Sequence, residues 1–123
     1  MMAALADDSA LLARYLDVVN RSIEVHRSQR RMLQRLLAAE TNLGDRTVVC
    51  EITHHDGSPP TPLGVRLEHG CLRASPPADG APGLEWRIPR GHLERVIRDP
   101  WKYVQHPEQL DWSWAHPDVA KTA

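Results

Sequence analysis

The sequence predicts an α+β domain, in which a long N-terminal helix and shorter C-terminal helices cover an antiparallel, four- to five-stranded meander. Three observations lead to this fold class. Glycine and proline are absent from residues 9–42, four short runs alternate apolar and polar residues between 47 and 88, and helical spacing returns at 91–98. The 123 residues, 41% of them hydrophobic, are expected to form a single domain over 1–123.

The first predicted element is a helix over about residues 9–42, either one long helix or two helices with a kink. Residues Asp7–Ser9 are acidic and capping residues ahead of it, and Gly44 closes it. Two rows with seven-residue spacing run along it, namely Leu5, Leu12, Val19, His26, Leu33 and Leu16, Ile23, Arg30, Leu37. Such rows indicate either a coiled-coil-like seam, in which polar His26 and Arg30 fix the register, or a helix that covers a sheet and overhangs into solvent.

Four strands are predicted over about residues 47–54, 63–68, 71–75 and 84–88, because apolar and polar residues alternate in each. The second and third strands form a hairpin through the turn His69-Gly70. This turn sets Leu67 opposite Leu72, Val65 opposite Ala74 and Arg66 opposite Arg73. A proline-rich loop, 75–83, precedes the last strand, and the short links between consecutive strands predict the meander.

The polar face of this hairpin carries arginines in opposition, since Arg66 faces Arg73 and Arg87 of the next strand shares the face. Two interpretations remain open. The glutamates at positions 51, 68 and 85 can interleave with the arginines, or the face can bind an anion or an acidic partner.

The C-terminal part is predicted as a helix over about 91–98, followed by a Trp-rich helical or irregular end over 100–116. Because the chain has no Phe, its aromatic volume comes from Trp and Tyr. These side chains can plug the core or form the wall of an apolar pocket. The candidate ligand-binding residues are Trp86, Trp101, Tyr103, Trp112 and Trp114.

The chemistry-bearing residues show no catalytic, metal or cofactor signature, so no catalytic residue, metal ligand or cofactor is assigned. His54-His55-Asp56 is the densest ionisable group, and a strand-end His beside an Asp can act as a general base. Cys50 and Cys71 lack a CxxC spacing and are expected to be reduced thiols, buried or half-buried in strands.

The net charge of −1 gives no overall attraction to nucleic acid or to an anionic membrane. No run reaches the length of a membrane span, and the first residues lack the basic and apolar regions of a signal peptide. We therefore expect a cytoplasmic protein with no nucleic-acid partner and no membrane span.

The segments Gly64–Ala74 and Gly83–Ile88, followed by a helix carrying Leu93, Val96 and Ile97, resemble sterol-carrier-protein domains of the non-specific lipid-transfer type. The resemblance covers about residues 47–98. It implies an apolar tunnel between sheet and helices that binds a lipid, with no catalytic residues. The long N-terminal helix, the lack of a clear fifth strand and the Trp-rich end depart from the family pattern.

Three functions are therefore considered. The first is a non-catalytic binding module for a hydrophobic small molecule or lipid. The alternative is an accessory protein that dimerises, or docks on a partner, through its heptad-patterned N-terminal helix. The third is a small cofactor-independent enzyme that uses His54, His55 and Asp56.

Overall fold

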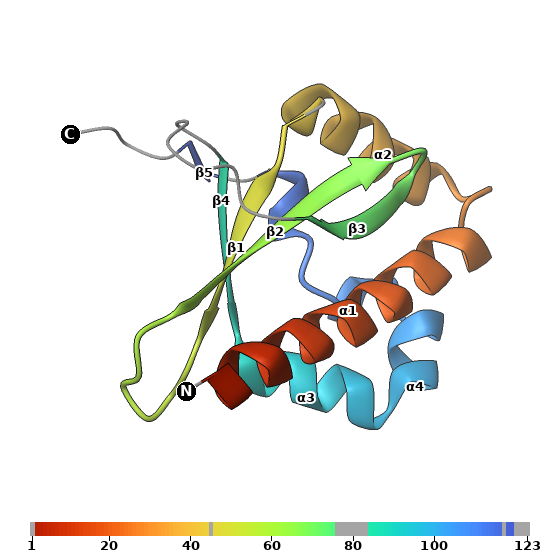
Figure 1. The fold of residues 1–123 in the computed structure, drawn as a ribbon. Coiled ribbons are helices and arrows are strands. Elements are labelled where there is room, and N and C mark those ends of the chain that lie inside the picture. The colour runs from red at the N-terminus through yellow and green to blue at the C-terminus, as the bar shows by residue number, and fades with distance from the viewer. Residues whose placement is uncertain (1, 45, 76–83, 117, 120–123) are drawn as a thin grey trace.

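The computed structural model describes residues 2–44, 46–75, 84–116 and 118–119, with side chains from Asp8 to His116 within these ranges (Figure 1). The predicted loop 75–83 lies outside the described residues except for Ser75. The elements in chain order are α1 (Met2–Val25), α2 (Arg30–Leu43), β1 (Val48–Thr53), β2 (Thr61–Glu68), β3 (Cys71–Ser75), β4 (Leu84–Pro89), α3 (Arg90–Arg98), α4 (Pro100–Gln105), η1 (Pro107–Gln109), η2 (Ser113–Ala115) and β5 (Asp118–Val119). The α+β class is thus confirmed.

The sheet is mixed, and the predicted antiparallel meander is wrong. Its strands lie in the order β3-β2-β1-β4, with the two-residue β5 beside β4. The central strand β1 is antiparallel to β2 but parallel to β4. The prediction assumed that β4 pairs with its predecessor β3, whereas β4 pairs with the open edge of β1. There Trp86 lies beside Cys50 and Ile88 beside Ile52, so the apolar rows of the two strands form one continuous inner face.

The predicted hairpin register is confirmed. Leu67 lies opposite Leu72, and Arg66 lies opposite Arg73. The turn between them places His69 at φ 53° and Gly70 at φ 77°. Two successive positive φ angles match the right-handed twist of the strands, and glycine adopts such an angle without a steric cost.

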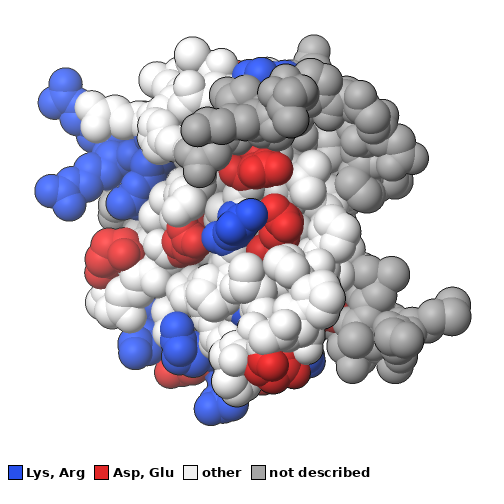
Figure 2. Space-filling model, turned by 90° about the vertical axis from the view of Figure 1, so that its left-hand side faces the viewer, with Lys and Arg blue, Asp and Glu red and all other residues white. Residues whose placement is uncertain are grey.

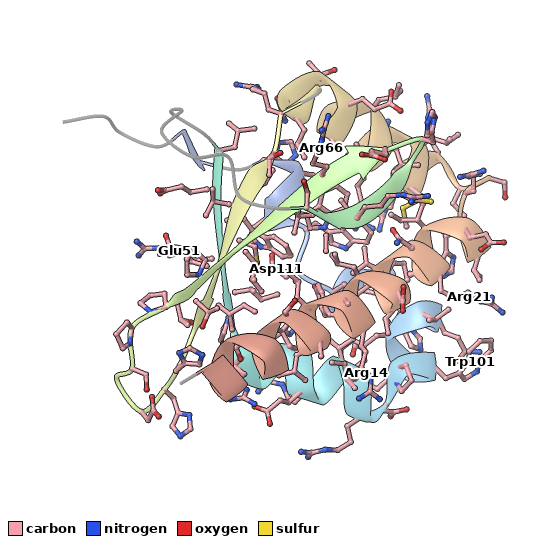
Figure 3. The ribbon with its side chains drawn as sticks, in the orientation of Figure 1. Arg14, Arg21, Glu51, Arg66, Trp101 and Asp111 are labelled. Atoms are coloured by element: carbon pink, nitrogen blue, oxygen red, sulfur yellow. The ribbon has the colours of Figure 1, made fainter. Side chains whose placement is uncertain are left out.

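The outer face of the sheet carries the interleaved charges that one interpretation predicted. Arg87 Nε lies 3.4 Å from Glu51 Oε1, and Arg73 Nε lies 3.8 Å from Glu68 Oε2. Glu51 points away from the helices (Figure 3). Figure 2 shows the molecule from this side, with acidic and basic side chains next to one another near the centre. Arg73 and Arg87 are therefore each compensated by a nearby glutamate.

The N-terminal helical region is two helices, so the kinked alternative holds and a single helix over 9–42 does not. Residues 26–29 form the turn between α1 and α2. Near this turn, the Ser22 hydroxyl donates to the Val104 carbonyl, and His26 Nε2 lies 3.0 Å from the same oxygen. These contacts hold the end of α1 against α4. His26 and Arg30, the polar residues within the two heptad rows, thus lie where the helix changes direction (Figure 1).

The start of α1 also differs from the prediction. The helix begins at Met2, so Asp8 and Ser9 lie inside it and do not cap it. Asp8 is fully buried. Leu5, the first residue of the heptad rows, has its side chain outside the described part of the structure.

The helices cover the inner face of the sheet in two groups. Helix α1 packs against β3, α3 and α4, whereas α2 packs against η2 and β2. At the edge of the sheet, the Asn20 side chain donates to the Leu72 carbonyl (2.9 Å) and accepts from the Leu72 N–H (2.7 Å). The amide thereby satisfies the backbone N–H and C=O of Leu72, which a neighbouring strand would otherwise bond at the edge of β3. Among the described residues, none of the helices has the length and apolar character needed to span a membrane.

Candidate functional site

Four rings form a series of contacts between the sheet and the helices, and one carboxylate lies beside the Trp86 end of it. These five residues, called the aromatic–carboxylate cluster below, are Tyr15, Trp86, His92, Tyr103 and Asp111. The ring centroids of Tyr15 and His92 are 5.6 Å apart. The Tyr15 ring also lies 6.3 Å from the Trp86 ring, and the His92 ring lies 6.3 Å from the Tyr103 ring. Figure 3 shows Asp111 on the helix side of the sheet.

Five separate parts of the fold position these residues. Tyr15 comes from the inner row of α1, Trp86 from the inner face of β4, His92 from the first turn of α3, Tyr103 from α4 and Asp111 from the segment between η1 and η2. Asp111 is held by a local turn, because its Oδ1 accepts a hydrogen bond of 2.8 Å from the Ser113 N–H.

The polar contacts inside the cluster are long. Tyr15 OH lies 3.5 Å from His92 Nε2 and 3.5 Å from the Asp111 carbonyl oxygen. Trp86 Nε1 lies 3.4 Å from Asp111 Oδ2. Protein hydrogen bonds of these kinds normally measure about 2.7–3.2 Å. The groups therefore converge on one region while their mutual bonds remain weak.

Burial sets the protonation states around the cluster. It raises the pKa of the Tyr15 hydroxyl, and the nearby Asp111 carboxylate raises it further. Burial, again with Asp111, raises the pKa of the Cys50 thiol to about 12. Burial lowers the pKa of His92, against the opposing effect of the Asp111 charge. At neutral pH the site therefore presents a protonated phenol, a protonated thiol and a neutral imidazole, which favours hydrogen bonding over nucleophilic attack.

The five aromatic residues predicted from the sequence fall into three places. Trp86 and Tyr103 belong to the aromatic–carboxylate cluster. Trp112 and Trp114 form a pair with ring centroids 5.6 Å apart, where Trp114 is fully buried. Trp101 is 59% exposed and points away from the body of the protein on α4 (Figure 3). The structure therefore brings two of the five together with residues that the sequence argument did not select.

The Trp112–Trp114 pair connects to α2. The Arg35 guanidinium lies 4.7 Å from the centre of the Trp112 ring, and Trp112 Nε1 donates to the Pro107 carbonyl at 2.6 Å. Within the part of the chain that the structure describes, the buried Trp114 Nε1 has no hydrogen-bond partner. These contacts make the pair part of the packing between α2 and the C-terminal segment.

A groove of about 370 Å³ lies elsewhere, between the C-terminal half of α1 and the β2–β3 turn. It is lined by Asp17, Asn20, Arg21, Ile23, Glu24, Arg27, Gly70 and Cys71. None of the predicted ligand-binding aromatic residues lines this groove.

The predicted group His54-His55-Asp56 is divided by the structure. His54 Nε2 lies 2.8 Å from the Oδ2 atom of buried Asp8, and its Nδ1 lies 3.2 Å from the Pro59 carbonyl. Asp56 instead accepts bonds from Ser58, which lowers the pKa of its carboxyl group. Both nitrogens of His54 thus face oxygen acceptors other than the Asp56 carboxylate, which is bonded to Ser58.

Asp8 is the centre of this second polar group. Its Oδ2 also accepts a hydrogen bond of 2.6 Å from Thr61, and its Oδ1 lies 3.6 Å from Arg90 Nε. A buried carboxylate is tolerated only when it is paired in this way. The group joins α1 to β2, to the chain after β1 and to the start of α3.

Both cysteines are free thiols, Cys50 buried and Cys71 half-buried, as the sequence predicted. Within residues 2–44, 46–75, 84–116 and 118–119, no group of three or more His, Cys, Asp or Glu side chains could hold a metal ion. Comparison of the chain with protein-family models, with curated proteins and with solved structures finds no match.

Sequence reasoning missed Tyr15, His92 and Asp111 as a site. Tyr15 counted only toward the aromatic volume from Trp and Tyr, and neither His92 nor Asp111 was selected. No local spacing joins them, because Tyr15 is 77 residues from His92 and 96 from Asp111.

Proposed function

We propose that this protein is a non-catalytic binding module for a hydrophobic small molecule or lipid. The bound molecule presents a hydroxyl oxygen to the aromatic–carboxylate cluster. The choice of an apolar ligand follows from the resemblance to sterol-carrier-protein domains and from the aromatic character of the cluster.

One observation carries the proposal. Tyr15 OH, His92 Nε2 and the Asp111 carbonyl converge within aromatic rings, yet each contact of the phenol is 3.5 Å long. An oxygen placed beside them could approach each group to about 2.8 Å, at the length of a normal hydrogen bond. Binding would then replace weak contacts by strong ones, while the rings of Trp86 and Tyr103 contact the apolar part.

The half-buried members mark the side of the cluster nearest to solvent. His92 and Asp111 are neither fully buried nor fully exposed, whereas Tyr15 has no exposed surface. A ligand head group could therefore enter past His92 and Asp111 and end at the phenol. Neutral His92 imposes no charge on an apolar molecule there.

The test is a fluorescence titration in which tryptophan transfers energy to dehydroergosterol, a fluorescent sterol with a free hydroxyl. Its acetate ester serves as the matched ligand without a hydroxyl donor. We expect the free sterol to bind more tightly. Tyr15→Phe keeps the ring but removes the phenolic oxygen, and should weaken sterol binding about tenfold while leaving the ester almost unchanged.

Trp101→Phe is the control, because Trp101 is exposed and lies outside the cluster. It should leave the affinity unchanged. Absence of binding for both sterols, or equal sterol affinity in wild type and Tyr15→Phe, would refute the proposal.

A further inference from the structure

Helix α2 carries two exposed leucines that are not part of the buried core of this chain. Leu33 is 45% exposed and Leu37 is 62% exposed, whereas Met32, Ala39 and Leu43 of the same helix are buried. At 100° per residue, Leu33 and Leu37 lie one turn apart, on a side roughly 120° from the buried row. In the heptad rows, Leu12 and the other apolar residues of α1 from residue 12 to 23 are buried in the domain. Among the described apolar residues of the two rows, only Leu33 and Leu37 on α2 therefore remain available to a partner.

Two opposite charges frame these leucines. Arg30 precedes Leu33 by one turn, and Glu40 follows Leu37 by one turn. Both are exposed, and neither forms an ion pair with any residue in the described ranges. All four residues lie within an arc of roughly 80° on the helix. The face thus consists of a leucine pair with a positive charge at one end and a negative charge at the other.

This face is complementary to itself. The four positions are symmetric about residue 35, since residues 30 and 40, and residues 33 and 37, are equally distant from it. When two copies of α2 pack antiparallel about a two-fold axis at residue 35, each Leu33 meets the second copy's Leu37. Each Arg30 then meets the second copy's Glu40. An isologous interface requires this kind of self-complementary surface.

We propose that the face formed by Arg30, Leu33, Leu37 and Glu40 binds a second copy of this chain through such an antiparallel contact. The helix has 14 residues and is therefore about 21 Å long. A single helix pair of this length buries much less than the roughly 800 Å² per partner of a standard stable interface. The dimer is accordingly weak and reversible.

The test is sedimentation velocity of the full chain over micromolar to millimolar concentrations. Wild type should shift from monomer to dimer. Arg30→Glu or Glu40→Arg alone should weaken the dimer at least about tenfold, because each change turns both ion pairs into like-charge contacts. The double variant Arg30→Glu/Glu40→Arg should restore it. An equimolar mixture of the two single variants should form a heterodimer, since their charges complement each other.

Arg31→Glu is the matched control, because it makes the same charge change on the same helix but on the opposite side from the leucine face. Its dimer should be as strong as that of the wild type. If the wild type is a monomer at every concentration, the proposal is overturned, and the leucine face would then have to bind a partner other than a second copy. An equal effect of Arg31→Glu and Arg30→Glu, or failure of the double variant to recover, would also overturn it.

Discussion

Replacement of Asn20 by alanine should destabilise the protein by exposing the edge of its sheet. Asn20 makes two hydrogen bonds with the backbone of Leu72, at 2.9 Å and 2.7 Å. A typical protein hydrogen bond contributes about 1 kcal/mol net, so the loss of both should cost about 2 kcal/mol. The unfolding entropy of a chain of 123 residues is about 260 cal/mol/K, and the melting temperature should therefore fall by about 8 °C.

The assay is urea and thermal unfolding followed by circular dichroism, with amide hydrogen exchange at Leu72 as a local readout. Asn20→Asp should lose a large part of the same stability, because it keeps the acceptor but places an oxygen against the Leu72 carbonyl. Arg21→Ala is the control, since the neighbouring Arg21 side chain is exposed and points away from the sheet (Figure 3). If Asn20→Ala falls within about 0.5 kcal/mol of Arg21→Ala, the edge argument is refuted.

Two further predictions concern buried charge and pH. Asp8→Ala should cost about 3 kcal/mol in urea unfolding, because it leaves largely buried His54 and the Thr61 hydroxyl without their acceptor, while half-exposed Arg90 keeps its contact with Glu94. A cost below about 1 kcal/mol would contradict the pairing. Burial lowers the pKa of His92 in the folded state below its ordinary value of 6.5, so the unfolded chain takes up this proton first on acidification. The contribution of His92 to the free energy of unfolding should therefore be complete above about pH 6.5. This contribution should be lost as the pH falls from there through the lowered pKa. The difference in unfolding free energy between wild type and His92→Gln should shrink between pH 7.5 and 5, and a constant difference would show that His92 is not desolvated.

The features that the sequence predicted correctly are local ones. The hairpin register follows from the turn His69-Gly70, because two residues at positive φ fix which residues face each other. The inner rows of β1 and β4 follow from strict alternation, since a strand with one buried face has to place every second residue inward. Neither feature depends on which strand becomes the neighbour.

The errors concern contacts between distant segments. Alternation marks the inner face of β4 but is the same whether β4 pairs with β3 or with β1. Likewise, Asp8 is a residue type that often caps helices. Only the distance of 2.8 Å between its Oδ2 and His54 Nε2 shows that it is an inward-facing residue of α1. The choice between such alternatives depends on the packing energy of the whole core in each arrangement, and a local sequence pattern carries no information about that energy.

The sequence by itself determined the α+β class, the strand positions and the outward charges, because these follow from periodicity and turn chemistry. Tertiary structure decided the parallel pairing of β1 with β4, the break between α1 and α2, and the meeting of Tyr15, His92 and Asp111. The physical reason is that packing joins residues far apart in the chain and changes their solvation. Burial gives Tyr15, Cys50 and His92 shifted pKa values that no sequence neighbour imposes.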